Sequence, residues 1–116
     1  MSALLYQLKA EFFKTLAHPT RIRVLELLSQ RDHTVAELLP EIGIEAAHLS
    51  QQLAVLRRAG LVVTRKEGSA VYYSLTSPHV AELLAVARTI LTTVLSGQVE
   101  LLEDLREPDR RSSPAG

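Results

Sequence analysis

The chain of 116 residues contains no cysteine. Disulfide bonds, thiolate metal sites and redox sensing through thiols are therefore excluded. The chain also has no excess of charge, because 13 basic residues balance 13 acidic ones. Any affinity for nucleic acid must come from a local concentration of basic residues. The lack of disulfides fits the cytoplasmic location that we expect.

Long hydrophobic runs are absent too. No apolar run approaches the roughly 20 residues that span a bilayer, so we expect no membrane segment. Polar residues interrupt the stretch 1–9 too early for a signal peptide. No nucleophile elbow, phosphate loop or complete metal-hydrolase motif is present, so we do not expect an enzyme.

Apolar residues make up 47% of the chain, enough for one core. The length predicts one domain, which we place over 1–106, and the polar segment 107–116 is expected to be a disordered tail. Helical spacing of the apolar residues predicts five helices, at 3–16, 19–29, 35–42, 45–59 and 78–105. We expect Gly97 to be a soft point in the last of these helices.

A change of period after Gly60 predicts a β-hairpin, with strands at 61–65 and 70–75 around the turn 66–69. Thr34 and Glu37 predict a capping box at the start of the short helix. The short helix, the Gly43 turn and the next helix have helix-turn-helix dimensions. With the hairpin behind them, they predict a mainly α, winged helix-turn-helix fold of five helices and a two-stranded wing.

The helix that begins after Glu45 carries the most informative pattern. Leu49, Leu53 and Leu56 share one face and are expected in the core. Small and amide-bearing side chains lie off that face. We expect them beside base edges in a DNA major groove, and they are Ala46, Ala47, Ser50 and Gln51. Ser50 and Gln51 are expected to contact bases directly. The alternative is an ordinary surface helix.

Basic residues gather just after these positions. Four basic residues lie within ten positions: Arg57, Arg58, Arg65 and Lys66. A single acidic residue, Glu67, lies close to them. This local charge favours DNA binding over a merely solvated helix end. Phosphate contacts are expected from Arg57, Arg65, Lys66 and, at a helix N-terminus, Thr34.

The first and last helices carry apolar stripes broader than a core of this size needs. A long exposed apolar stripe marks an interface, so we expect a homodimer. The expected interface residues are Leu4, Leu5, Leu8 and Phe12 on the first helix, and Leu84, Leu91, Val94 and Leu95 on the last. Two-fold symmetry would place two DNA-reading helices about one DNA turn apart, roughly 34 Å.

Four segments, Leu16–Leu25, Val35–Leu38, Leu49–Leu61 and Val71–Leu75, resemble as a set the ArsR/SmtB family of bacterial winged-helix transcriptional regulators. The resemblance covers roughly residues 4–95. It implies a homodimer formed by the first and last helices and binding to a palindromic operator. It also implies repression that is relieved when a metal ion or another inducer binds.

The metal sites of that family are mostly missing. One uses a cysteine pair, and this chain has no cysteine. Another uses ligands on the last helix, of which only His79 remains, because Ser77, Ile90 and Thr93 occupy the other positions. A carboxylate such as Glu82, or a residue of a partner chain, would have to complete a site for nickel or zinc.

The other three histidines are expected to do different things. His18 lies in the segment between the first two helices, where the resemblance suggests a structural role. We expect His33 to be solvated in a polar turn and His48 to lie near DNA.

The sequence therefore predicts a dimeric, sequence-specific DNA-binding transcriptional regulator. A response to a divalent metal such as nickel or zinc is one hypothesis about its regulation. Two alternatives stay open. A regulator with no sensor site of its own would depend on a partner protein or another ligand. A winged-helix module could instead bind another protein through the same helix.

Overall fold

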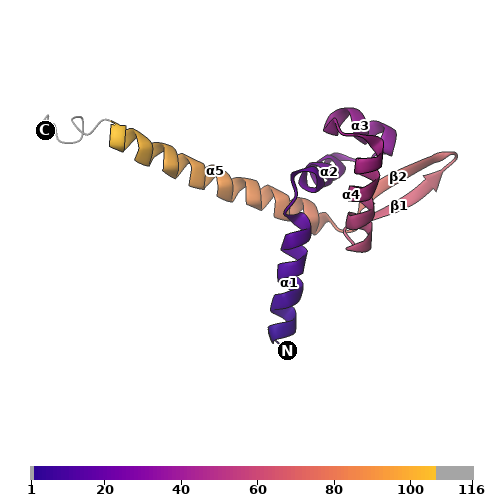
Figure 1. Cartoon of the computed structure of the whole chain (residues 1–116), viewed down its shortest axis with the longest axis horizontal. Helices are drawn as coiled ribbons and strands as arrows, with labels where there is room; N and C mark the ends of the chain where they lie inside the picture. The colour runs from indigo at the N-terminus through magenta and orange to yellow at the C-terminus, as the bar shows by residue number, and fades with distance from the viewer. Residues whose placement is uncertain (1, 107–116) are drawn as a thin grey trace, which may run out of the picture. The chain divides into compact units, whose positions relative to one another are not determined.

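The computed structural model describes residues 2–106 (Figure 1). The elements follow in the order α1 (Ser2–Leu16), α2 (Pro19–Gln30), α3 (Val35–Ile42), α4 (Ala46–Arg58), β1 (Val62–Glu67), β2 (Ala70–Leu75) and α5 (Pro78–Arg106). They divide into two compact units, Met1–Glu82 and Leu83–Gly116. Grouping both units into one domain stays a prediction, and the predicted disordered tail lies outside the described residues.

Capping explains where α3 begins and ends. The hydroxyl of Thr34 accepts a hydrogen bond from the backbone N–H of Glu37, whose carboxylate accepts one from the N–H of Thr34. This reciprocal pair confirms the predicted capping box at the start of α3. Gly43 ends α3 with a φ of 76°, a left-handed conformation that favours glycine. α4 begins at Ala46, after the two intervening residues Ile44 and Glu45.

The leucine face of α4 forms the centre of the core. Leu49, Leu53 and Leu56 are at most 1% exposed, as the sequence predicted. α4 packs against α2, α3 and β1, and Leu25 of α2 and Leu38 of α3 are fully buried in this core. Burial of several leucines on one face fixes α4 in place and leaves its opposite face outward.

The hairpin is longer than the sequence predicted. β1 continues to Glu67, and its antiparallel ladder with β2 runs from the pair Val62–Leu75 to the pair Glu67–Ala70. Gly68, with a φ of 63°, makes the tight turn. Because side chains alternate along a strand, the extension assigns fixed faces to the two residues before the turn.

α5 is a continuous helix of 29 residues, and Gly97 does not interrupt it. Among the described residues, this helix alone is long and apolar enough to cross a membrane by length and composition, with an 18-residue window of mean hydropathy 1.5. The search for uninterrupted apolar runs in the sequence did not detect this helix, because threonine, serine and glycine are interspersed along α5. A helix that packs on another protein surface has the same composition.

Acid is expected to weaken the α3 cap. The hydrogen bond from the backbone of Thr34, helped by the charge of Arg31, lowers the pKa of Glu37 below its ordinary value. A lowered carboxyl pKa contributes stability that is present above the unfolded-state pKa and lost as the pH falls through the folded-state pKa. Glu37→Gln keeps an acceptor but cannot titrate.

We therefore expect the urea midpoint of the wild type to fall more than that of Glu37→Gln between about pH 6 and about pH 3. Equal acid dependence of the two proteins would show that protonation of Glu37 does not contribute to the loss of stability in acid. Glu11→Gln on α1 serves as a control for loss of one exposed carboxylate.

Candidate nucleic-acid interface

The outward face of α4 presents the side chains that the sequence assigned to base contacts. Ala46, Ala47, Ser50 and Gln51 are all exposed. These residues lie in the first two turns of the helix, and their side chains are short or end in a hydroxyl or an amide. The structure thus brings the four predicted reading residues together on one surface.

Gln52, the next residue along, has a different role that the sequence interpretation missed. Its side chain is buried, with 8% exposure, and its Oε1 accepts a hydrogen bond of 2.7 Å from Nε of Arg21. Arg21 also donates to the carbonyl oxygen of Thr15 at 3.1 Å. Arg21 therefore connects α4 to the C-terminal end of α1. The available signal was the position of Gln52, which comes three residues after Leu49 on the leucine face.

A cleft of about 330 Å³ lies between α4 and the wing. It is lined by Ser50, Leu53, Ala54, Arg57, Arg58 and Tyr73. Two guanidinium groups, a serine hydroxyl and a phenol hydroxyl suit an anionic oxygen group such as a phosphate. The sequence assigned no DNA role to Tyr73, although its alternation with Val71 and Leu75 indicated which face of β2 it occupies.

The two basic residues of the wing lie on opposite faces. Lys66 pairs with Val71, and Thr64 pairs with Tyr73, so Lys66 is on the same face of the hairpin as the tyrosine of the cleft. Arg65 pairs with Tyr72 and lies on the other face. Lys66 is exposed.

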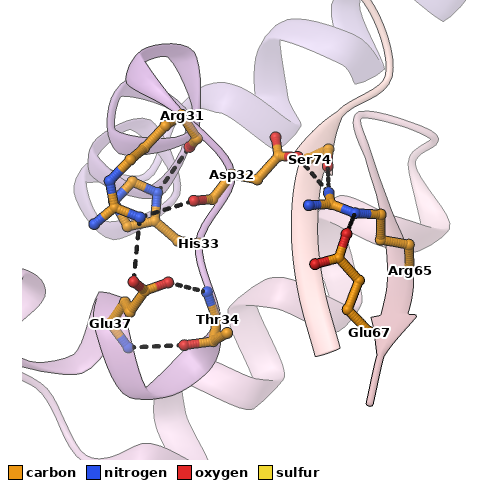
Figure 2. A network of polar contacts seen from close by, with 8 residues as sticks. All are labelled: Arg31, Asp32, His33, Thr34, Glu37, Arg65, Glu67 and Ser74. Atoms are coloured by element: carbon orange, nitrogen blue, oxygen red, sulfur yellow. Dashed lines mark hydrogen bonds and ion pairs between the residues drawn. The ribbon is translucent and has the colours of Figure 1, made fainter. Parts of the chain in front are cut away.

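Arg65 is held within the chain (Figure 2). Its Nε donates to a carboxylate oxygen of Glu67 at 3.0 Å, and its Nη1 donates to Asp32 and, at 3.3 Å, to Ser74. The guanidinium carbon also lies 4.8 Å from the centre of the Tyr72 ring. Hydrogen bonds to Glu67 and Asp32 raise the pKa of Arg65. Two of the three guanidinium nitrogens of Arg65, which the sequence assigned to phosphate, already donate to protein acceptors.

Thr34 is in a similar position. Its backbone N–H donates to Glu37, and its hydroxyl accepts from the backbone of the same residue. The carboxylate of Glu37 also receives a hydrogen bond of 3.3 Å from Arg31. Part of the N-terminus of α3 is thus occupied by the chain's own carboxylate, which weakens its attraction for a phosphate.

The histidines correct one sequence expectation. His33 is buried, with 3% exposure, instead of solvated, because its backbone pairs with Tyr73 and its Nδ1 lies 2.8 Å from the carbonyl oxygen of Arg31. His18 caps α2 by accepting from the backbone N–H of Thr20, which confirms its structural role. Its ring centre is 6.4 Å from that of His48 on α4.

His79 is exposed at the start of α5. Its Nδ1 lies 3.2 Å from the carboxylate of Glu82. No cluster of three or more histidine, aspartate or glutamate side chains that could hold a metal ion occurs within residues 2–106. One imidazole and one carboxylate per chain make only part of a metal site.

The residues expected at a dimer interface are mostly exposed in the single chain. Exposed side chains are those of Leu4, Leu5, Leu8, Leu91, Val94 and Leu95, whereas Phe12 and Leu84 are half-buried. Further along α5, the exposed apolar residues continue through Val99, Leu101, Leu102 and Leu105. Such contiguous apolar exposure is typical of a surface that another protein covers.

The helix-turn-helix of α3 and α4, followed directly by a hairpin and flanked by a basic cleft, defines a winged helix-turn-helix protein of the DNA-binding class. Comparisons with known proteins agree. The family model for the bacterial regulatory proteins of the arsR family matches residues 18–64. The chain belongs to this family and is a transcriptional regulator of the ArsR/SmtB type.

Relatives match over most of the chain. The uncharacterized HTH-type transcriptional regulator Rv0081 of Mycobacterium tuberculosis is 63% identical over 103 residues, which cover 88% of this chain and 90% of the relative. Its crystal structure superimposes with a TM-score of 0.78 at 62% identity, over 82% of this chain and 96% of that one.

Two further relatives are more distant. The biofilm growth-associated repressor of Xylella fastidiosa is 40% identical over 84 residues, covering 72% of this chain and 74% of the relative. The homodimeric winged helix-turn-helix DNA-binding domain of Mb0332 from Mycobacterium bovis has a TM-score of 0.74 at 30% identity, over 83% of this chain and 89% of that one.

Proposed function

We propose that the protein is a homodimeric repressor that places α4 of each protomer in the major groove of a palindromic operator. The observation that carries this proposal is the outward face of α4, where short polar side chains lie beside a cleft lined by Arg57 and Arg58. The leucine face on the other side anchors the helix. Burial on one face and base-sized polar groups on the other suit a reading helix.

Each part of the surface has a distinct task. Ser50 and Gln51 hydrogen-bond to base edges, and Ala46 and Ala47 pack close to the bases, near a thymine methyl group. Arg57 and Lys66 contact phosphates on either side of the groove. The hydroxyl of Thr34 accepts a hydrogen bond from Glu37 within the cap, and it donates its own hydrogen to a phosphate at the start of α3. The neutral whole-chain charge is compatible with this, because the charge on the reading surface is local.

The dimer forms through α1 and α5. Support comes from the exposed leucines of α1 and from the exposed apolar residues that continue along α5. The similar Mb0332 domain of Mycobacterium bovis is homodimeric. A soluble regulator of this kind works on cytoplasmic DNA, and a partner protein could modulate it as an alternative to a small inducer.

A response to nickel or zinc is a separate hypothesis about regulation. The pair of His79 and Glu82 is its starting point within the described residues. A site would need further nitrogen or oxygen ligands, for example across the dimer. Isothermal titration with nickel and zinc tests it: sub-micromolar binding that also changes operator affinity supports the metal response. Absence of both leaves regulation to another ligand or a partner.

The DNA-binding proposal is tested by selection and titration. The purified protein is used to select bound fragments from a random-sequence pool and from its own promoter. We expect inverted half-sites about one helical turn apart and affinity that falls steeply with salt. A failure to retain any fragment at low salt contradicts the proposal and favours the protein-interaction alternative.

Lys66→Gln is expected to weaken binding to all DNA sequences by a similar factor. Affinity falls as the salt concentration rises, so log affinity against log salt has a negative slope. Loss of one phosphate contact should make this slope shallower by about 0.9. The measurement is a titration of cognate and unrelated fragments at several salt concentrations. Lys9→Gln on α1 makes the same charge change away from the reading surface and should keep the wild-type slope. A Lys66→Gln slope equal to that of the wild type removes this lysine from the interface.

A further inference from the structure

The wing is joined to the segment between α2 and α3 by backbone hydrogen bonds. The N–H of His33 donates to the carbonyl oxygen of Tyr73 at 3.2 Å, and the N–H of Tyr73 donates back to His33 at 2.8 Å. This antiparallel pair is an isolated β-bridge that places His33 beside Tyr73 of β2. These two backbone hydrogen bonds act at one position, in addition to the packing of β1 against α4 and of β2 against α2 and α3.

Arg65 supplies the side-chain link at this junction. It reaches from β1 to Asp32, which directly precedes the backbone pair, and it also bonds Glu67 and Ser74 within the hairpin (Figure 2). The contact with Asp32 joins residues 33 positions apart in the chain. Arg65 therefore connects both strands of the wing to the segment that enters α3.

The charge around Arg65 does not favour a phosphate. One guanidinium faces two carboxylates, those of Asp32 and Glu67, at hydrogen-bonding distance. A phosphate approaching this group would meet a net negative site, in which Nε and Nη1 of Arg65 already donate to protein acceptors. The other basic residue of the wing, Lys66, lies on the face that carries Tyr73 of the cleft.

We propose that Arg65 is a positioning residue: it clamps the wing to the segment before α3 and thereby presents Lys66 and Tyr73 beside the reading helix. This inference rests on the proposed function for its consequence on DNA, whereas the clamp itself exists without DNA. It replaces the sequence expectation that Arg65 contacts a phosphate. Arginine is required because its planar fork addresses several acceptors at once, which a lysine ammonium cannot reproduce in the same geometry.

The clamp is tested first without DNA, by amide hydrogen exchange of Tyr73, whose N–H bonds to His33. We expect Arg65→Gln, Arg65→Lys and Asp32→Asn each to accelerate this exchange by about tenfold, on the scale of one coupled side-chain contact. The double variant Arg65→Gln/Asp32→Asn should match the single variants, because each change breaks the same link. Arg23→Gln, which removes an exposed ion pair with Glu41, should leave the exchange unchanged. Wild-type exchange in Arg65→Lys or Asp32→Asn overturns the clamp.

The same variants are then titrated with a selected DNA fragment. A positioning role predicts that Arg65→Lys weakens binding about as much as Arg65→Gln, although the charge is kept. It also predicts that the salt slopes of Arg65→Lys and Arg65→Gln differ less from the wild-type slope than the slope of Lys66→Gln does. A phosphate contact predicts the opposite: Arg65→Lys retains affinity, Arg65→Gln lowers the slope by about 0.9, and Asp32→Asn tightens binding by freeing Arg65. That second pattern overturns the proposal. If the wild type binds no DNA, the proposed function fails and the exchange experiment still decides the clamp.

Discussion

Replacing Leu91 by glutamate is expected to convert the dimer into a monomer and to lower operator affinity by at least about a hundredfold. Leu91 is 59% exposed in the single chain and lies on the apolar stripe of α5. A glutamate there would have to be desolvated in an apolar interface, which costs several kcal/mol without a partner charge. A monomer contacts one half-site, so it loses the second set of contacts that the dimer makes on the same DNA.

Sedimentation gives the oligomeric state, and titration of a selected operator gives the affinity. Thr89→Glu is the matched control, because residues two positions apart lie on opposite sides of a helix and Thr89 is on the polar side of α5. We expect this control to stay dimeric. A dimeric Leu91→Glu, or a monomeric one with wild-type affinity, contradicts the assignment of α5 to the interface.

Gln51→Ala is expected to cost about 1 to 3 kcal/mol on the cognate site and little on unrelated DNA. The exposed amide of Gln51 can donate and accept together, which suits the edge of an adenine. Its loss should therefore relax discrimination at one base pair in each half-site. Titration of the cognate fragment and of single-base variants measures this directly.

The neighbouring glutamine provides a sharp contrast. Gln52 is buried and bonded to Arg21, so Gln52→Ala should lower the free energy of unfolding by about 1 to 3 kcal/mol and leave the base preference of the folded protein unchanged. Unfolding in urea separates the two variants. Equal effects of both substitutions on base preference would show that α4 does not present Gln51 as described.

Local patterns made the helix-turn-helix predictable. The capping box of Thr34 and Glu37, the glycine at the end of α3 and the leucine spacing of α4 all act within a few residues, and all three are confirmed. Periodicity also identified the two strands of the wing. It placed the end of β1 too early, because charged residues next to a glycine are typical of a turn as well as of an exposed strand.

The contacts that the sequence did not predict join distant parts of the chain. Asp32 and Arg65 are 33 positions apart, and Arg21 and Gln52 are 31 apart. No spacing rule connects such pairs. The sequence therefore did not predict the ion pair of Arg65 with Asp32 or the hydrogen bond that holds Gln52 in the core. His33 read as solvated for the same reason, since its burial depends on pairing with Tyr73.

The central claim is that α4 reads bases in the major groove. It is tested most directly with the selected operator and the same operator in which the purines of both half-sites are replaced by 7-deaza analogues. These analogues lack N7, a major-groove acceptor, and keep Watson–Crick pairing. We expect the substituted operator to bind at least about tenfold more weakly, the size of one or two lost base contacts. Equal affinity for the two operators would contradict the account.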